Sequence, residues 1–155
     1  NNAVSIPVIA AGGIATGRQM LAAMVLGAEG VQVGTRFVAS EEASVHTAFK
    51  NAVINAVEGD TLLSIKKLTP VRLLKNKFFH QIQEAEQRGA TADELKQLLG
   101  RSRAKKGMFE GNLDEGELEI GQVSALVNSV MPADQIVKNI WSEFEQALLN
   151  PIKKQ

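Results

Sequence analysis

Residues 7–14 read Pro-Val-Ile-Ala-Ala-Gly-Gly-Ile, and residues 26–37 read Leu-Gly-Ala-Glu-Gly-Val-Gln-Val-Gly-Thr-Arg-Phe. The first stretch is an apolar run without alternation, which is typical of a strand buried on both faces of a parallel sheet. A helix is expected over residues 17–26, ended by Gly27 in the C′ position. Residues 30–33 then return to strand. Together these elements form a βαβ unit of about 30 residues, the size of a parallel crossover.

Both predicted strands end in glycine at the same edge of the sheet. Because the carboxyl ends of parallel strands lie on the face where ligands bind, Gly12, Gly13 and Gly34 are expected to lie close together. Without a Cβ, they let a ligand approach their N–H groups, and such groups near helix N-termini favour a phosphate. The alternative is that these glycines only make tight turns. The spacing matches neither the dinucleotide fingerprint nor the Walker A loop, so the better fit is the phosphate site on the last two strands of a (β/α)₈ barrel.

At this point the residues resemble a known family. Residues 7–14 and 26–37 look like strands seven and eight of the nitronate monooxygenase superfamily, FMN-dependent (β/α)₈ enzymes with a smaller second domain. Downstream, three motifs are similar to its flavin-dependent enoyl-acyl carrier protein reductase branch: Thr69-Pro-Val-Arg-Leu-Leu-Lys-Asn76, Lys106-Gly-Met-Phe-Glu-Gly111 and Gly121-Gln-Val-Ser-Ala125. The resemblance extends over nearly the whole chain.

The resemblance implies a cofactor site but no catalytic residue. The FMN phosphate would be held by backbone groups at the two strand ends, with the hydroxyl of Thr35 as an addition: Gly12, Gly13, Gln32, Val33, Gly34 and Thr35. The family's histidine and its other glycine-rich loops would lie upstream of this segment. The resemblance also implies NAD(P)H as co-substrate.

Three polar residues inside the branch-like motifs are expected to contact the substrate or NAD(P)H, namely Arg72, Lys75 and Gln122. For Gln122, a structural role at a helix start is an equal alternative. The basic stretch 101–106 would either attract a dinucleotide phosphate or an acidic acyl carrier protein, or form a solvated loop.

The two histidines are typical of packing or surface positions rather than catalysis. His46 lies between apolar positions of an amphipathic pattern, and His80 has no partner at metal-ligand spacing. We therefore expect no metal site.

Length limits how much of a barrel this chain can hold. A (β/α)₈ barrel needs about 200 to 400 residues, whereas this chain has 155. We therefore expect an α/β fold that is the C-terminal part of a TIM barrel, its last two β/α units, plus a mostly helical smaller domain. Residues 1–57 would form the barrel units, 58–131 a nucleotide or substrate domain, and 132–155 a helix packing back on the barrel. The N-terminal half of the same protein would be the partner.

Beyond residue 39 the sequence is more highly charged, and its hydrophobic pattern is predominantly helical. Ser40 is expected to cap a helix with two glutamates in its first turn. A short strand over 61–66, a helix over 76–88 and a capping box at 91–94 follow. A helix over 121–130 and a final one from Pro132 complete the pattern.

Composition narrows the function classes. Seventeen basic and seventeen acidic residues give no net charge, which argues against a dedicated nucleic-acid binder. The chain has no cysteine, so thiol catalysis and disulfides are excluded. Neither a long apolar span nor a signal-like leader is present, so we expect no membrane partner and a cytoplasmic protein. A homodimer stays open.

Three functions remain. The first is an FMN-dependent enoyl-acyl carrier protein reductase of fatty-acid synthesis, which uses NAD(P)H to reduce the double bond of an enoyl thioester; its partner would be acyl carrier protein or an acyl thioester substrate. The second is a nitronate monooxygenase, which oxidises alkyl nitronates with O₂. The third, from another class, is a non-catalytic α/β binding module.

Overall fold

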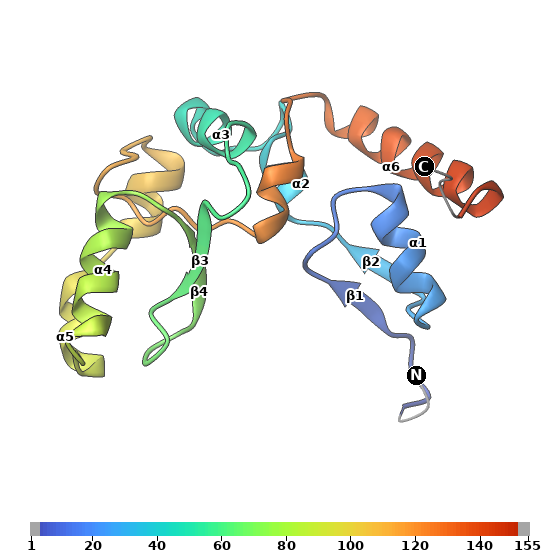
Figure 1. The fold of residues 1–155 in the computed structure, drawn as a ribbon. Helices are drawn as coiled ribbons and strands as arrows, with labels where there is room; N and C mark the ends of the chain where they lie inside the picture. The colour runs from blue at the N-terminus through green and yellow to red at the C-terminus, as the bar shows by residue number, and fades with distance from the viewer. Residues whose placement is uncertain (1–3, 152–155) are drawn as a thin grey trace. The chain divides into compact units, whose positions relative to one another are not determined.

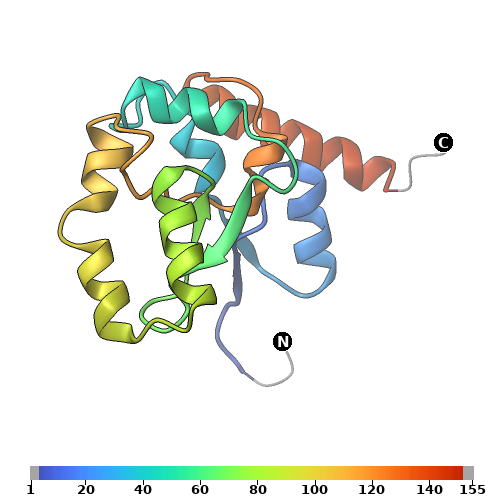
Figure 2. The ribbon, with the colours of Figure 1, turned by 60° about the vertical axis from the view of Figure 1, so that its left-hand side comes forward.

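The computed structural model of the chain describes residues 4–151 and has an α/β fold (Figures 1 and 2). Its contacts divide it into two compact units. The first unit comprises the residues up to Ala43 and those from Ser129 onward, and the second is Ser44–Asn128. The division falls after Ala43, whereas the sequence places a boundary after residue 57. The helix in between makes its contacts within the second unit.

The first unit contains the predicted βαβ motif. Strand β1 (Ile9–Ala11) leads into helix α1 (Gly17–Val25), and strand β2 (Gly30–Gln32) returns parallel to β1. Helix α1 begins with a capping box in which Thr16 and Gln19 satisfy each other's backbone N–H groups. The helix ends before Gly27, whose φ of 100° allows the left-handed turn. The predicted crossover is confirmed.

The expectation that these strands are buried on both faces is wrong. Ile9 exposes 53% of its surface, and Ala11 and Gln32 are exposed too. Helix α1 packs beside β2, but no other described element of the first unit covers the opposite face. An apolar run without alternation is typical of a strand that is covered on both faces, and the first unit alone does not cover both faces of these strands.

Two further helices complete the first unit. Helix α2 (Thr35–Val38) follows β2 directly, and helix α6 (Ala133–Leu149) packs along α1. Pro132 caps α6 at its N-terminus, next to a parallel bridge between Ser40 and Met131. The buried Arg36 donates to the carbonyl of Ser129 and so ties α2 to the segment before α6.

The second unit is built on an antiparallel hairpin. Strands β3 (Thr61–Ser64) and β4 (Val71–Leu74) pair along their length, and residues 118–120 extend the sheet beside β4. Strand β3 was predicted, whereas the motif containing β4 was not recognised as a strand.

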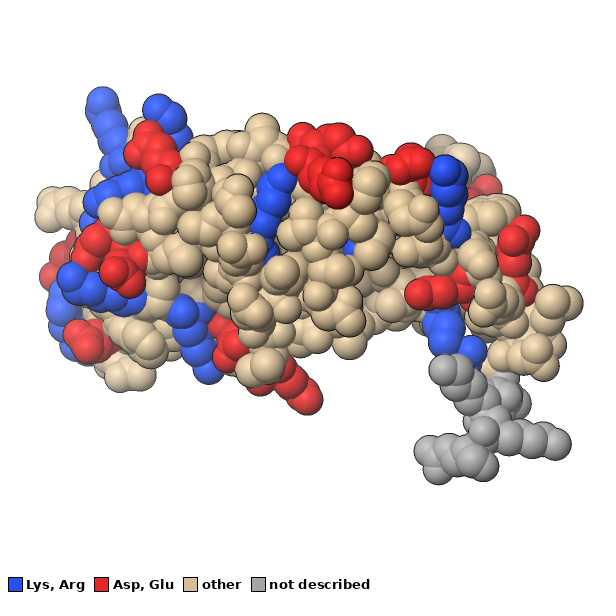
Figure 3. All heavy atoms as spheres, turned by 90° about the horizontal axis from the view of Figure 1, so that it is seen from above, with Lys and Arg blue, Asp and Glu red and all other residues tan. Residues whose placement is uncertain are grey.

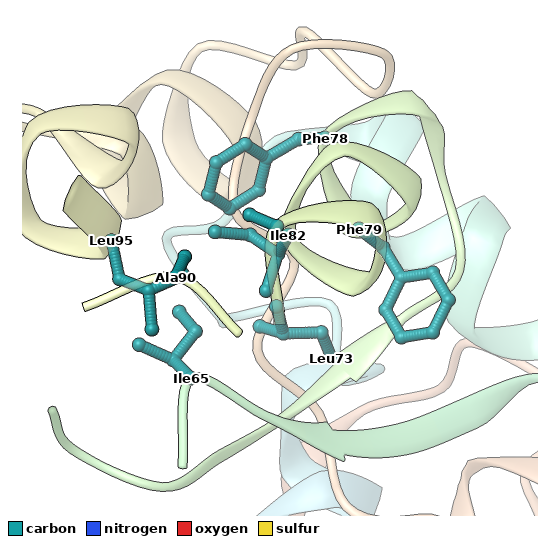
Figure 4. Packing of buried hydrophobic residues seen from close by; sticks show 8 residues of the cluster. Ile65, Leu73, Phe78, Phe79, Ile82, Ala90 and Leu95 are labelled. Carbon is teal, nitrogen blue, oxygen red and sulfur yellow. The ribbon is translucent and has the colours of Figure 1, made fainter. Parts of the chain in front are cut away.

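Helices pack on one side of this hairpin. Helix α4 (Lys77–Gln87) is capped by Asn76, and helix α5 (Ala92–Leu99) opens with the predicted capping box of Thr91 and Glu94. Figure 4 shows the shared core, in which side chains of the hairpin and both helices meet: Ile65, Leu73, Phe78, Phe79, Ile82, Ala90 and Leu95.

Two helix predictions in this part of the chain are wrong. Helix α3 (Thr47–Ile54) begins six residues later than expected, because Nδ1 of His46 accepts the N–H of Ala48 and makes His46 the cap. Ser40 instead closes a local turn by accepting the N–H of Ala43. The segment 121–130 forms only a short 3₁₀ helix, η2 (Gln122–Leu126), since its backbone turns extended at Val127.

One buried carboxyl in the second unit lacks a partner. Glu117 is only 7% exposed, and its side chain makes no hydrogen bond or ion pair within residues 4–151. Burial, assisted by the nearby negative charge of Glu119, raises the pKa of Glu117 to about 7. Arg103 opposes this shift only in part.

The first prediction concerns the contact between α1 and α6. A Cβ on Gly17 would collide with the backbone nitrogen of Phe144 and the carbonyl oxygen of Ile140. Helix propensity alone would make Gly17→Ala stabilising by about 1 kcal/mol. We expect the opposite, a loss of about 3 kcal/mol in the free energy of unfolding, because backbone cannot move aside easily. Chemical denaturation, with Ala22→Gly on the exposed face of α1 as the propensity control, decides the sign.

The second prediction concerns Glu117. The folded state keeps its proton up to about pH 7, whereas the unfolded chain releases it near the ordinary pKa of 4.5. The free energy of unfolding should therefore fall as pH rises through this window, by about 3 kcal/mol, and stay level above it. Glu117→Gln should remove that slope, and the exposed control Glu84→Gln should keep it. Identical slopes in wild type and Glu117→Gln would contradict the burial of this carboxyl.

Candidate functional site

The two glycine loops lie side by side at one edge of the β1–β2 sheet. In the parallel register Ala11 pairs with Gln32, so the loops that begin at Gly12 and at Val33 leave the sheet from adjacent strand ends. The structure thus brings together the strand ends that the sequence singled out.

The backbone of both loops leaves room for a ligand. Gly12 and Gly13 have φ values of 85° and 72°, a conformation that L side chains rarely adopt. No atom lies within 4 Å of a Cβ built on Gly12, Gly13 or Gly34. Within residues 4–151, the N–H groups of Gly13 and Gly34 have no hydrogen-bond acceptor. Unsatisfied amides on an open surface fit an anion with several oxygen acceptors.

The three other predicted residues of this site differ in what they offer. The side chain of Gln32 is exposed, on the side of the strand away from its neighbour Val33. Val33 lines an apolar hollow of about 280 Å³ together with Met20 and Trp141, so only its backbone is available at the strand end. Thr35 begins helix α2 and is half-buried.

The N-terminus of α1 is already used by side chains. Oε2 of Glu143, on α6, accepts the N–H of Gly17 at 2.9 Å. Oε1 of Gln19 accepts the N–H groups of Ala15 and Thr16. These acceptors satisfy the amides and place a carboxylate at the positive end of the helix dipole. Anion binding must therefore rest on the loop glycines rather than on the α1 terminus that the sequence suggested.

The residues predicted to meet substrate or NAD(P)H all lie in the second unit. Nη1 of Arg72 donates to the carbonyl and hydroxyl of Thr61 across the hairpin, so part of this guanidinium serves the sheet. Lys75 is exposed, and its backbone N–H donates to the carbonyl of Asp60. Gln122 is exposed at the start of η2.

The basic stretch 101–106 is ordered rather than loose. Arg103 donates to the carbonyls of Leu98, Leu99 and Glu115, and its guanidinium lies 4.6 Å from the centre of the Phe78 ring. Lys105, in the π-helical turn η1 (Lys105–Phe109), pairs with Glu110 at 3.3 Å. Figure 3 shows basic and acidic side chains intermixed on the face in view.

The remaining candidates offer no acid–base or metal centre. His46 is a helix cap, and the ring of His80 packs edge-on against Phe79. Among residues 4–151, no group of three histidine, aspartate or glutamate side chains could hold a metal ion. Over the same residues, each helix is too short or too polar to cross a bilayer. Among the described residues, the loops of the first unit offer open backbone amides but no side chain suited to proton transfer.

Sequence comparison gives this chain a family match. Residues 1–143 match the model of the nitronate monooxygenase family. A probable nitronate monooxygenase of Staphylococcus saprophyticus is 36% identical over 146 residues, and one of Staphylococcus aureus is 37% identical over 149 residues. Each alignment covers 94% of this chain and 41% of the relative. The chain therefore spans less than half the length of these relatives.

Solved structures agree with the sequence match. FabK from Thermotoga maritima is 39% identical with a TM-score of 0.89, and the match covers 97% of this chain and 48% of FabK. A nitroalkane oxidase from Streptomyces ansochromogenes is 29% identical with a TM-score of 0.77, covering 96% of this chain and 42% of that one.

Proposed function

The chain belongs to the nitronate monooxygenase family, and from that membership we propose that it forms the phosphate-binding part of an FMN-dependent oxidoreductase. The observation that carries the proposal is the pair of glycine loops at adjacent parallel strand ends. Gly13 and Gly34 offer amides without an acceptor in the described chain, and no neighbouring atom occupies the space where a Cβ would stand. A phosphate needs both features.

The proposed architecture explains why this site lies where it does. We propose that β1 and β2 are the last two strands of a (β/α)₈ barrel, whose phosphate sites are built from the loops after strands seven and eight. A short extra helix after the last strand is part of that arrangement, and α2 follows β2 directly. The likeness to FabK supports this assignment. The exposed faces of Ile9 and Ala11 would be covered by the N-terminal half of the protein.

The residues of this chain would bind and orient the cofactor. The loop amides of Gly12, Gly13, Gly34 and Thr35 would hold the phosphate and so anchor FMN at one end. When bound, FMN supplies the redox chemistry, taking electrons from a reduced donor and passing them to an acceptor. The acid–base groups of the reaction would come from outside this chain, since none lies at the loops. Lys75 and Gln122 have exposed side chains that could meet NAD(P)H or substrate, whereas Arg72 is partly committed to Thr61.

Two reactions compete for this scaffold. An enoyl-acyl carrier protein reductase would use NAD(P)H to reduce an enoyl thioester, and the likeness to FabK, with a TM-score of 0.89, supports it. A nitronate monooxygenase would oxidise alkyl nitronates with O₂, and the names of the relatives favour this reaction. Both need the same phosphate anchor, so the cofactor proposal does not depend on the choice.

The third prediction tests the anchor. Gly34 has a negative φ of −109° and open space around it, so a larger residue can be placed there without straining the fold. We expect Gly34→Val to bring a side chain beside the loop amides and to lower FMN affinity of the full-length protein at least about 10-fold. Flavin absorbance of the purified protein measures the loss.

Ala22→Val, on the exposed face of α1, is the matched control and should keep its flavin. Thermal unfolding should show both variants folded. A Gly34→Val protein with full flavin content would refute the phosphate assignment.

The fourth prediction separates the two reactions. If the protein is an enoyl reductase, we expect NAD(P)H consumption with crotonyl thioester and none with propionate-3-nitronate. Absorbance of the nicotinamide, followed with each substrate in turn, measures this. O₂ uptake with the nitronate and inertness toward the thioester would establish the monooxygenase instead.

A further inference from the structure

A hollow in the second unit contains the unpaired carboxyl of Glu117. It has a volume of about 590 Å³ and opens between the loop 65–70, helix α5 and the segment 117–119. We call it the Glu117 hollow. Leu68, Val71 and Leu99 form apolar walls, while Lys96 and Glu119 also line it.

The segment 117–120 brings two carboxyls to this hollow. Residues 118–120 run beside β4, with Leu74 N–H donating to the Leu118 carbonyl and Glu119 opposite Leu73. Both carboxyls line the hollow, but Glu117 is buried whereas Glu119 is exposed between the buried Leu118 and Ile120. Figure 4 shows Leu73 within the core of this unit.

No group in this unit neutralises Glu117. The charge of Arg103 lowers the pKa of Glu117, but this guanidinium donates to three backbone carbonyls and packs over Phe78. Lys96 lines the hollow with an exposed side chain and makes no ion pair with Glu117. Glu119 adds a second negative charge. Ionising a buried carboxyl that has no partner costs roughly several kcal/mol of desolvation free energy. For this reason the pKa of Glu117 is raised.

The backbone beside the hollow is strained as well. Ile65 has a φ of 57°, although it is β-branched and almost completely buried. Such a conformation costs about 1–3 kcal/mol and is concentrated at binding and switch sites. In Figure 4, Ile65 lies beside Ala90 and Leu95 at the edge of the core. The packing of Ile65 in the core holds this strained backbone in place, at the start of the loop 65–70 that forms one wall of the hollow.

We propose that the Glu117 hollow binds a small molecule that has a protonated amine on an apolar body. The ammonium group would donate hydrogen bonds to the carboxylates of Glu117 and Glu119, and the body would contact Leu68, Val71 and Leu99. A charge-assisted bond to an otherwise unpaired buried carboxylate gains both attraction and relief of desolvation. A bare metal ion fits less well, because apolar walls supply no further oxygen ligands. This site lies outside the loops assigned to FMN.

The test uses cyclohexylamine as the probe, with cyclohexanol as its neutral counterpart. At about pH 8, where Glu117 is ionised and the amine is protonated, methyl NMR of the full chain should show saturable shifts at Leu99 and Val71. We expect cyclohexanol to bind at least about 10-fold more weakly. Affinity for the amine should also fall as pH is lowered through 7, because Glu117 gains a proton there.

Variants distinguish specific binding of the amine at Glu117 from nonspecific binding to an apolar surface. Glu117→Gln keeps the shape and should weaken amine binding at least about 10-fold while leaving the weak binding of cyclohexanol unchanged. Glu84→Gln, on the exposed face of α4, should bind the amine like wild type. Thermal unfolding of each variant shows that it is folded.

Three results would overturn the proposal. They are amine shifts that do not saturate, equal affinity for amine and alcohol, and unchanged amine affinity in folded Glu117→Gln. If that variant does not fold, Glu119→Gln and the pH dependence in wild type carry the decision in the same way.

Discussion

The parallel pairing of β1 with β2 is the constraint on which the proposed cofactor site depends. Parallel strands must be joined by a crossover, here helix α1, and their carboxyl ends therefore emerge at one edge. The register pairs Ala11 with Gln32, so the loops carrying Gly13 and Gly34 leave the sheet from adjacent strand ends although they lie far apart in sequence. A slip of the register would separate the two loops and remove the convergence of their amides.

Packing of α6 on α1 satisfies the N-terminus of α1 from within the chain. Gly17 permits backbone contact between the helices, and that contact brings Glu143 to the first turn of α1. The carboxylate satisfies an amide that an anion would otherwise use and adds a negative charge at the helix terminus. The loop glycines keep their open space. This helix contact thus leaves the loop glycines, and not the α1 terminus, for the phosphate site that we propose.

The parts of the fold that the sequence predicts correctly are those determined by local signals. Glycines mark the ends of the elements in the βαβ motif, and the capping box at Thr91 marks the start of α5. Both signals can be read from the sequence because they act within a few residues. Prediction failed where a choice depends on tertiary contact. Both Ser40 and His46 can cap a helix, and the sequence does not distinguish between them. In the structure α3 begins after His46, whose N–H donates to the carbonyl of Met108, a residue distant in sequence. Glu117 looks like a solvated charge in sequence, and only the pairing of residues 118–120 with β4 buries it.

The claim that the two glycine loops hold a phosphate can be tested most directly by comparing FMN with riboflavin, which lacks that group. Backbone amide NMR of the full-length protein, with Gly13 and Gly34 assigned, reports on the loops themselves. Our account requires FMN to shift both amides and to bind at least about 100-fold more tightly than riboflavin, which should leave them unchanged. Equal affinities, or FMN binding that leaves Gly13 and Gly34 unperturbed, would contradict it.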